Sequence, residues 1–155
     1  MIQRIQTVFL LAIVALMTAT LFMPLAIIQV DELFYTFNVK GLYTTTPPSA
    51  LVTSFPALLG VLSSIVIIAL ITIFLYKKRI LQIRLCTLNA FLMIGFYGMV
   101  AFYLRKISGT TDFFDISNIR LALGFPMISL ILNYLAIQSI GADETLIRSL
   151  DRIRK

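Results

Sequence analysis

Four apolar stretches, each about as long as a bilayer is thick, constrain this chain more than any other feature of its sequence. The hydrocarbon core of a bilayer is about 30 Å thick, and a helix that rises 1.5 Å per residue needs about 20 apolar residues to cross it. The stretches that reach this length are residues 5–30, 55–76, 85–104 and 119–140. The sequence therefore predicts four transmembrane helices within one membrane domain, residues 1–155.

The composition excludes an ordinary soluble fold. Hydrophobic residues make up 59% of the chain and charged residues 13%, whereas soluble domains average about 45–50% and about 25%. A small domain cannot bury such an excess of apolar surface. Within a bilayer an open strand would leave backbone groups without hydrogen bonds, so even the β-branched residues 65–68 are expected to be helical. We expect an all-α membrane protein, a four-transmembrane-helix bundle.

Prolines and one serine suggest where these helices begin, end or bend. The first stretch exceeds the 7–15 apolar residues, approximately, of a signal peptide, so we expect a retained span whose last turns are loosened at Pro24. Ser54 is the expected N-cap of the second span, with Pro56 in its first turn. Pro126 lies inside the fourth stretch and predicts a kink there.

The distribution of basic residues predicts the orientation. The N-terminus, the turn between the second and third spans and the tail together hold nine Lys and Arg residues, and the opposite loops hold four. Short loops rich in Lys and Arg stay in the cytoplasm. We therefore expect a multi-pass membrane protein with both termini in the cytoplasm.

The first outer loop, residues 31–53, has two interpretations. Residues 34–39 and 42–45 are rich in strand-forming side chains and flank Lys40 and Gly41, which predicts a small β-hairpin. The alternative is an irregular loop whose aromatic side chains anchor in the membrane interface.

The tail, residues 141–155, is amphipathic. Leu146, Ile147, Leu150 and Ile153 recur at helical spacing, so we expect a C-terminal amphipathic helix. Three locations are consistent with this pattern: on the anionic inner leaflet, beneath the bundle, or against a cytosolic partner.

Opposite charges on the inner turn and the tail suggest that these segments meet. In this hypothesis Arg84, helped by Gln82 and Asn89, contacts Asp143, Glu144 or Asp151 and locks the cytoplasmic face. The alternative is that the arginines face lipid phosphate. The candidate residues of this interaction are Arg84, Asp143, Glu144, Arg148, Asp151 and Arg152.

Residues that support catalysis or metal binding are scarce. The chain has no histidine and a single cysteine, Cys86, which excludes a histidine-based triad, a Cys/His zinc site and an internal disulfide. No basic face interleaved with aromatic residues indicates nucleic-acid binding. We predict no catalytic residue, no metal and no cofactor.

Polar residues within the spans include Asn89 and Asn133. Interhelical hydrogen bonds are the usual role of such residues. A ligand pocket built on the two asparagines is the alternative.

Three segments carry a family resemblance: residues 1–6, residues 75–89 of the inner turn and residues 142–154 of the tail. Together they resemble the domain of unknown function 4293 family, small four-span inner-membrane proteins of Bacteroidetes. The resemblance covers the whole chain and implies location and architecture, but no catalytic residues.

Two functions are consistent with these features. The leading interpretation is a non-enzymatic scaffold or accessory subunit of a membrane complex, with membrane lipids and a protein partner or a second copy as its contacts. The alternative is a binder or carrier of lipids or small apolar molecules that uses a groove near Pro126 and Asn133.

Overall fold

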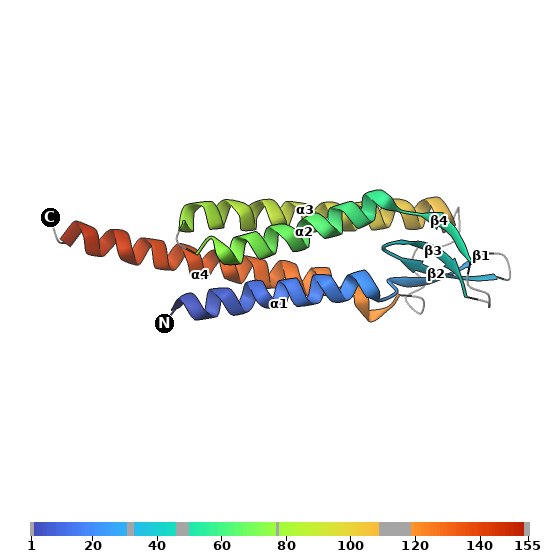
Figure 1. Ribbon diagram of the computed structural model, residues 1–155, viewed down its shortest axis with the longest axis horizontal. Coiled ribbons are helices and arrows are strands. Elements are labelled where there is room, and N and C mark those ends of the chain that lie inside the picture. The colour runs from blue at the N-terminus through green and yellow to red at the C-terminus, as the bar shows by residue number, and fades with distance from the viewer. Residues whose placement is uncertain (1, 31–32, 46–49, 77, 109–118, 154–155) are drawn as a thin grey trace.

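Four helices lie side by side along the long axis of the molecule, and a small antiparallel sheet lies at one end (Figure 1). The computed structural model describes residues 2–30, 33–45, 50–76, 78–108 and 119–153. The helices are α1 (Ile2–Phe22), α2 (Pro56–Phe74), α3 (Arg79–Ser108) and α4 (Phe125–Ile153). Both termini lie at the end opposite the sheet, which we call the terminal end, and the other is the sheet end.

Each helix buries one stripe of side chains and exposes the rest. Leu10, Ile13 and Met17 of α1 recur at helical spacing and are inaccessible, as are Leu58, Leu62, Ile65 and Ala69 of α2. Large apolar side chains cover the outside of the bundle. A surface of this kind would favour aggregation in water, whereas lipid solvates it. All four helices are long and apolar enough to cross a membrane, which confirms the prediction of four apolar helices of membrane-spanning length.

The first span is shorter than predicted. Residues 5–30 were expected to be helical, but α1 ends at Phe22 and strand β1 occupies Ala26–Val30. Pro24, which lacks an N–H, falls between them, and β-branched side chains follow. A continuous apolar run does not distinguish a buried strand from a helix, so the sequence pattern did not reveal this boundary.

The predicted hairpin is confirmed, and it forms the centre of a larger sheet. Strands β2 (Leu33–Asn38) and β3 (Gly41–Thr44) pair antiparallel, with Asn38 opposite Gly41. Strand β1 and strand β4 (Leu51–Ser54) add to the two edges, giving the order β1-β2-β3-β4. Gly41 is required for close strand approach, because a Cβ there would collide with the carbonyl oxygen of Thr53 and the side chain of Leu51.

The start of α2 differs from the prediction by one residue. Ser54 is the last residue of β4, and Phe55 occupies the N-cap position without a side-chain capping bond. Pro56 is in the first turn, as expected. The backbone N–H of Phe55 instead donates to the carbonyl of Lys40, 3.2 Å away, so β4 continues directly into the helix.

The sheet is fastened to the bundle through Phe55. This side chain is 3% exposed, and its ring centroid lies 5.3 Å from that of Phe37 in β2 and 4.6 Å from that of Tyr103 in α3. On the other edge, the N–H of Arg120 donates to the carbonyl of Leu25 at 3.1 Å. The sheet is thereby joined to α3 and to the segment that leads into α4.

The fourth span and the tail form one continuous helix. A short 3-10 helix, η2 (Leu121–Gly124), precedes α4, and Pro126 is only the second residue of α4. The predicted kink is therefore wrong, because a proline in the first turn displaces no helical hydrogen bond. The helix continues past residue 140 to Ile153 without a break.

Candidate functional site

A layer of buried polar groups closes the core at the terminal end. The Nε2 atom of Gln6 in α1 donates to the carbonyl of Ser139 in α4 at 3.1 Å. The Nε2 atom of Gln82 in α3 donates to the carbonyl of Thr72 in α2 at 3.2 Å. Gln6 is 6% exposed and Gln82 3%. The two amides thus tie the helices together in pairs at the level where the apolar core ends. We call Gln6, Thr72, Gln82 and Ser139 the polar layer.

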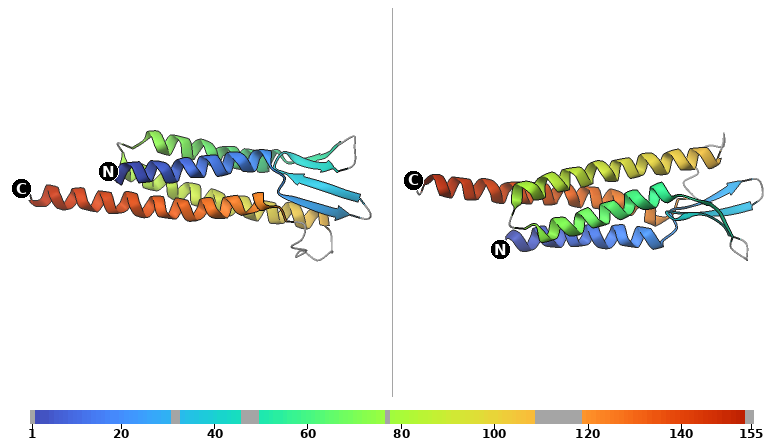
Figure 2. Two further views of the ribbon diagram at one scale, coloured as in Figure 1. Left: turned by 90° about the horizontal axis from the view of Figure 1, so that it is seen from below. Right: turned by 45° about the horizontal axis from the view of Figure 1, so that its top comes forward.

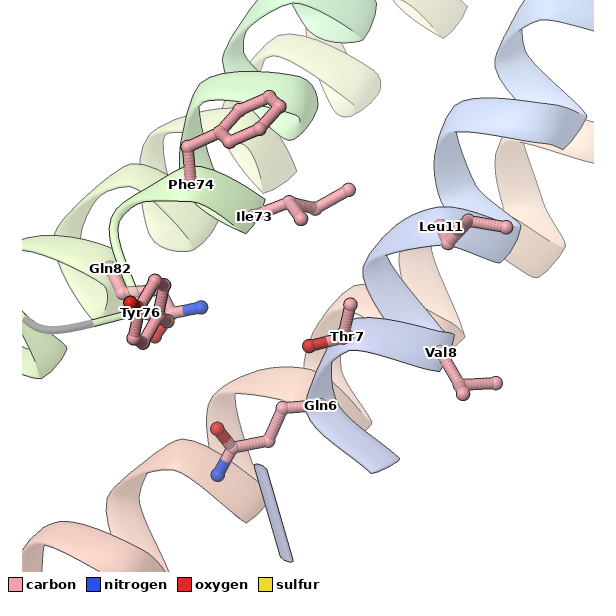
Figure 3. A pocket seen from close by; sticks show the side chains of 8 residues that line it. All are labelled: Gln6, Thr7, Val8, Leu11, Ile73, Phe74, Tyr76 and Gln82. Carbon is pink, nitrogen blue, oxygen red and sulfur yellow. The ribbon is translucent and has the colours of Figure 1, made fainter. Parts of the chain in front are cut away.

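A cleft of about 670 Å³ lies beside the polar layer, between the first turns of α1 and the end of α2 (Figure 3). Its volume falls within the range of about 300–1,000 Å³ that small-ligand pockets have. The cleft is mostly apolar, with amide and hydroxyl groups toward the terminal end. Its lining residues are Gln6, Thr7, Val8, Leu11, Ile73, Phe74, Tyr76 and Gln82.

An ion pair lies one turn beyond the polar layer. Nη1 of Arg79, the first residue of α3, is 3.1 Å from Oδ2 of Asp143 in α4. The two side chains are 17% and 14% exposed. The contact has the distance of an ion pair without the angular geometry of a hydrogen bond at Nη1. It joins the start of α3 to α4 just where the tail begins.

The structure describes the side chains of only some of the predicted cytoplasmic-face residues. Asp143 is paired, but with Arg79 and not with Arg84, whose side chain is exposed. Glu144, Arg148, Asp151 and Arg152 belong to α4, and their side chains lie outside the described part of the chain. Gln82 donates to the carbonyl of Thr72 in α2, and Asn89 is buried within the bundle.

Both intramembrane asparagines lie on buried helix faces. Asn133 is inaccessible, and its Nδ2 donates to the carbonyl of Cys86 at 2.8 Å, which links α4 to α3. Asn89 is 1% exposed, and within the described residues its Oδ1 has no hydrogen-bond partner. Pro126 is buried as well. In the described part of the chain, neither the Pro126 nor the Asn133 side chain is open to the surface, and the cleft of the terminal end is lined by other residues.

Sequence reasoning missed three of the residues that shape the terminal end. Gln6 and Tyr76 line the cleft, and Arg79 holds Asp143. An amide in the first turns of an apolar span was a usable signal for Gln6, since a buried amide requires a hydrogen-bond partner. Among the described residues, three or more His, Cys, Asp or Glu side chains do not gather where a metal ion could be held.

The apolar exterior, the four long helices and the buried polar layer define a multi-pass membrane protein. The chain matches the family described as Domain of unknown function (DUF4293) over residues 2–153, and it therefore belongs to that family. No curated protein and no solved structure matches it.

Proposed function

We propose that this protein is a non-enzymatic accessory subunit of a membrane complex in the cytoplasmic membrane of a bacterium. In this proposal the terminal end faces the cytoplasm and the sheet end faces outward. The excess of basic residues in the segments of the terminal end supports that orientation, nine against four. The central role is contact with a protein partner through the C-terminal part of α4.

The projection of α4 beyond the other helices is the observation that carries the proposal. Its 29 residues span about 44 Å at 1.5 Å per residue, which exceeds the hydrocarbon core of about 30 Å. The ribbon of α4 continues past the start of α1 and past the α2–α3 turn in every view (Figures 1 and 2). The last turns therefore lie beyond the rest of the bundle.

The sequence of this projecting part favours a protein partner. Leu146, Ile147, Leu150 and Ile153 recur at helical spacing. Because α4 is one continuous helix through residue 141, its last turns continue beyond the bundle (Figures 1 and 2). This supports a position in the aqueous phase and not flat on the membrane surface. An apolar stripe in water is stabilised by packing against another amphipathic helix. The flanking Arg148, Arg152 and Arg154 favour a partner with acidic flanks.

The available chemistry supports a non-enzymatic role. The chain has no histidine, the side chain that most often serves as a general acid or base. Cys86 is 1% exposed within the bundle. Asp143 is held by Arg79.

A pair of neighbouring substitutions tests the proposal. We expect Leu150→Glu to reduce the stoichiometric protein partner that co-purifies in mild detergent by about tenfold, because a carboxylate in the stripe would be buried at the interface. Quantitative mass spectrometry of the purified complex measures this. Ser149→Glu adds the same charge outside the stripe and should retain the partner.

The thermal unfolding temperature of each variant must match that of the original protein, which shows that the bundle itself is intact. Absence of a stoichiometric protein partner would contradict the proposal. Equal recovery of the partner with Leu150→Glu and Ser149→Glu would contradict it as well.

A further inference from the structure

We infer that the cleft at the terminal end binds one anionic phospholipid from the adjacent leaflet, with an acyl chain between α1 and α2 and the phosphate beside Lys78. This inference does not depend on the proposed protein partner. It rests on the position of the cleft, on the order of polar and apolar groups along it and on the charge of the terminal end.

The cleft lies between two helices that are each able to cross a membrane, so its opening faces the bilayer. In Figure 3, α1 and the end of α2 form its sides, and Ile73 extends from α2 toward α1. Val8 is 62% exposed, Leu11 60% and Phe74 77%. In a bilayer such surfaces are covered by acyl chains.

Along the cleft, the lining changes from apolar within the membrane-spanning part to polar at the terminal end, as the acyl chain and headgroup of a lipid do. Leu11 and Ile73 lie deeper in the membrane-spanning part, whereas Gln6 and Tyr76 lie nearer the terminal end. Tyrosine commonly sits at the level of the headgroups. The amides of Gln6 and Gln82 are fixed by their bonds to the backbones of α4 and α2. The cleft thus has apolar walls that can contact the acyl chain of a phospholipid and polar groups that can contact its ester group.

The charge of the terminal end favours an anionic headgroup. By their positions in the sequence, nine Lys and Arg residues belong to its segments against three acidic residues, namely Asp143, Glu144 and Asp151. The remaining four basic and four acidic residues belong to the segments of the sheet end, so the formal net charge of +6 belongs to the terminal end. Lys and Arg residues at a membrane surface attract anionic headgroups electrostatically. Lys78 is exposed two residues after Tyr76.

Two isoleucine-to-tryptophan substitutions on α2 test the part of the cleft that would bind the acyl chain. Purified full-length protein in mild detergent is titrated with phosphatidylglycerol or phosphatidylcholine, and retained lipid is counted by native mass spectrometry. We expect one phosphatidylglycerol to be retained at least about tenfold more tightly than phosphatidylcholine. Ile73→Trp fills the cleft and should weaken this binding about tenfold. Ile67→Trp is the control, because Ile67 is 55% exposed on the same helix and does not line the cleft.

Charge substitutions test the headgroup part and avoid the walls of the cleft. Lys78→Glu should abolish the preference for phosphatidylglycerol, and Lys106→Glu, an exposed position near the other end of α3, should leave it unchanged. The lipid-induced rise in unfolding temperature provides a second readout. Equal binding of the two lipids, or unchanged binding by Ile73→Trp, would overturn the inference. Should Ile73→Trp fail to fold, retained selectivity in Lys78→Glu would overturn it on its own.

Discussion

Replacing Phe55 by alanine is expected to lower the free energy of unfolding by about 3–5 kcal/mol, the usual cost of truncating a buried phenylalanine. Phe55 is 3% exposed, and its ring packs against Phe37 of the sheet and Tyr103 of α3. The residue also joins β4 to α2. Truncation therefore leaves a cavity at the junction through which the sheet is attached.

Reversible unfolding of the purified protein in mixed detergent measures this loss, and hydrogen exchange reports where it acts. The amides of β2 and β3 should exchange faster in Phe55→Ala, whereas those of the middle of α3 should change little. Phe91→Ala is the matched control, since Phe91 is 68% exposed on α3, and we expect it to cost less than about 1 kcal/mol. Equal losses in the two variants would contradict this role of Phe55.

Reversing the charge of Arg79 is expected to lower the free energy of unfolding by about 2–4 kcal/mol, because it places a second carboxylate beside a mostly buried Asp143. The double variant Arg79→Glu with Asp143→Arg should recover at least half of that loss. The same unfolding experiment measures these two variants and the single variant Asp143→Arg. The loss in the double variant minus the sum of the two single losses gives the coupling energy between the two positions.

Arg84→Glu is the control for this cycle. Arg84 is exposed, so the change should stay within about 0.5 kcal/mol. Additive losses at Arg79 and Asp143 would show that the pair is not coupled. A large loss of unfolding free energy in Arg84→Glu would instead support the hypothesis that Arg84, and not Arg79, holds the inner turn to the tail.

The sequence predicted those parts of the fold that depend on local patterns. The lengths of the apolar runs identified all four helices, and two segments rich in strand-forming residues on either side of Lys40 and Gly41 identified the central hairpin. The end of α1 was misplaced because the apolar side chains of β1 are compatible with either a strand or a helix. The boundary depends on pairing of β1 with β2, which is a tertiary interaction.

The terminal end was only partly predictable. Opposite charges on the inner turn and the tail indicated a contact, and the structure has one at Asp143. Asp143 pairs with Arg79 and not with Arg84 because the two arginines lie on different faces of α3. They are five residues apart, which corresponds to about 1.4 helical turns. The cleft could not be predicted, because it depends on the spacing of α1 and α2, a tertiary feature that no local sequence pattern reports.

The proposed orientation underlies both the partner of α4 and the leaflet that supplies the lipid. It can be tested with single-cysteine variants, because Cys86 is the only cysteine and is buried. In a Cys86→Ala background, Thr53→Cys marks β4 at the sheet end and Thr145→Cys marks α4 at the terminal end, both at exposed positions.

The decisive measurement is labelling of these two variants with a membrane-impermeant maleimide in spheroplasts of a bacterial host, before and after lysis. We predict that Thr53→Cys reacts in intact spheroplasts and that Thr145→Cys reacts only after lysis. The reverse pattern would place the sheet end in the cytoplasm. That result would contradict the proposed orientation, and with it the cytoplasmic partner of α4.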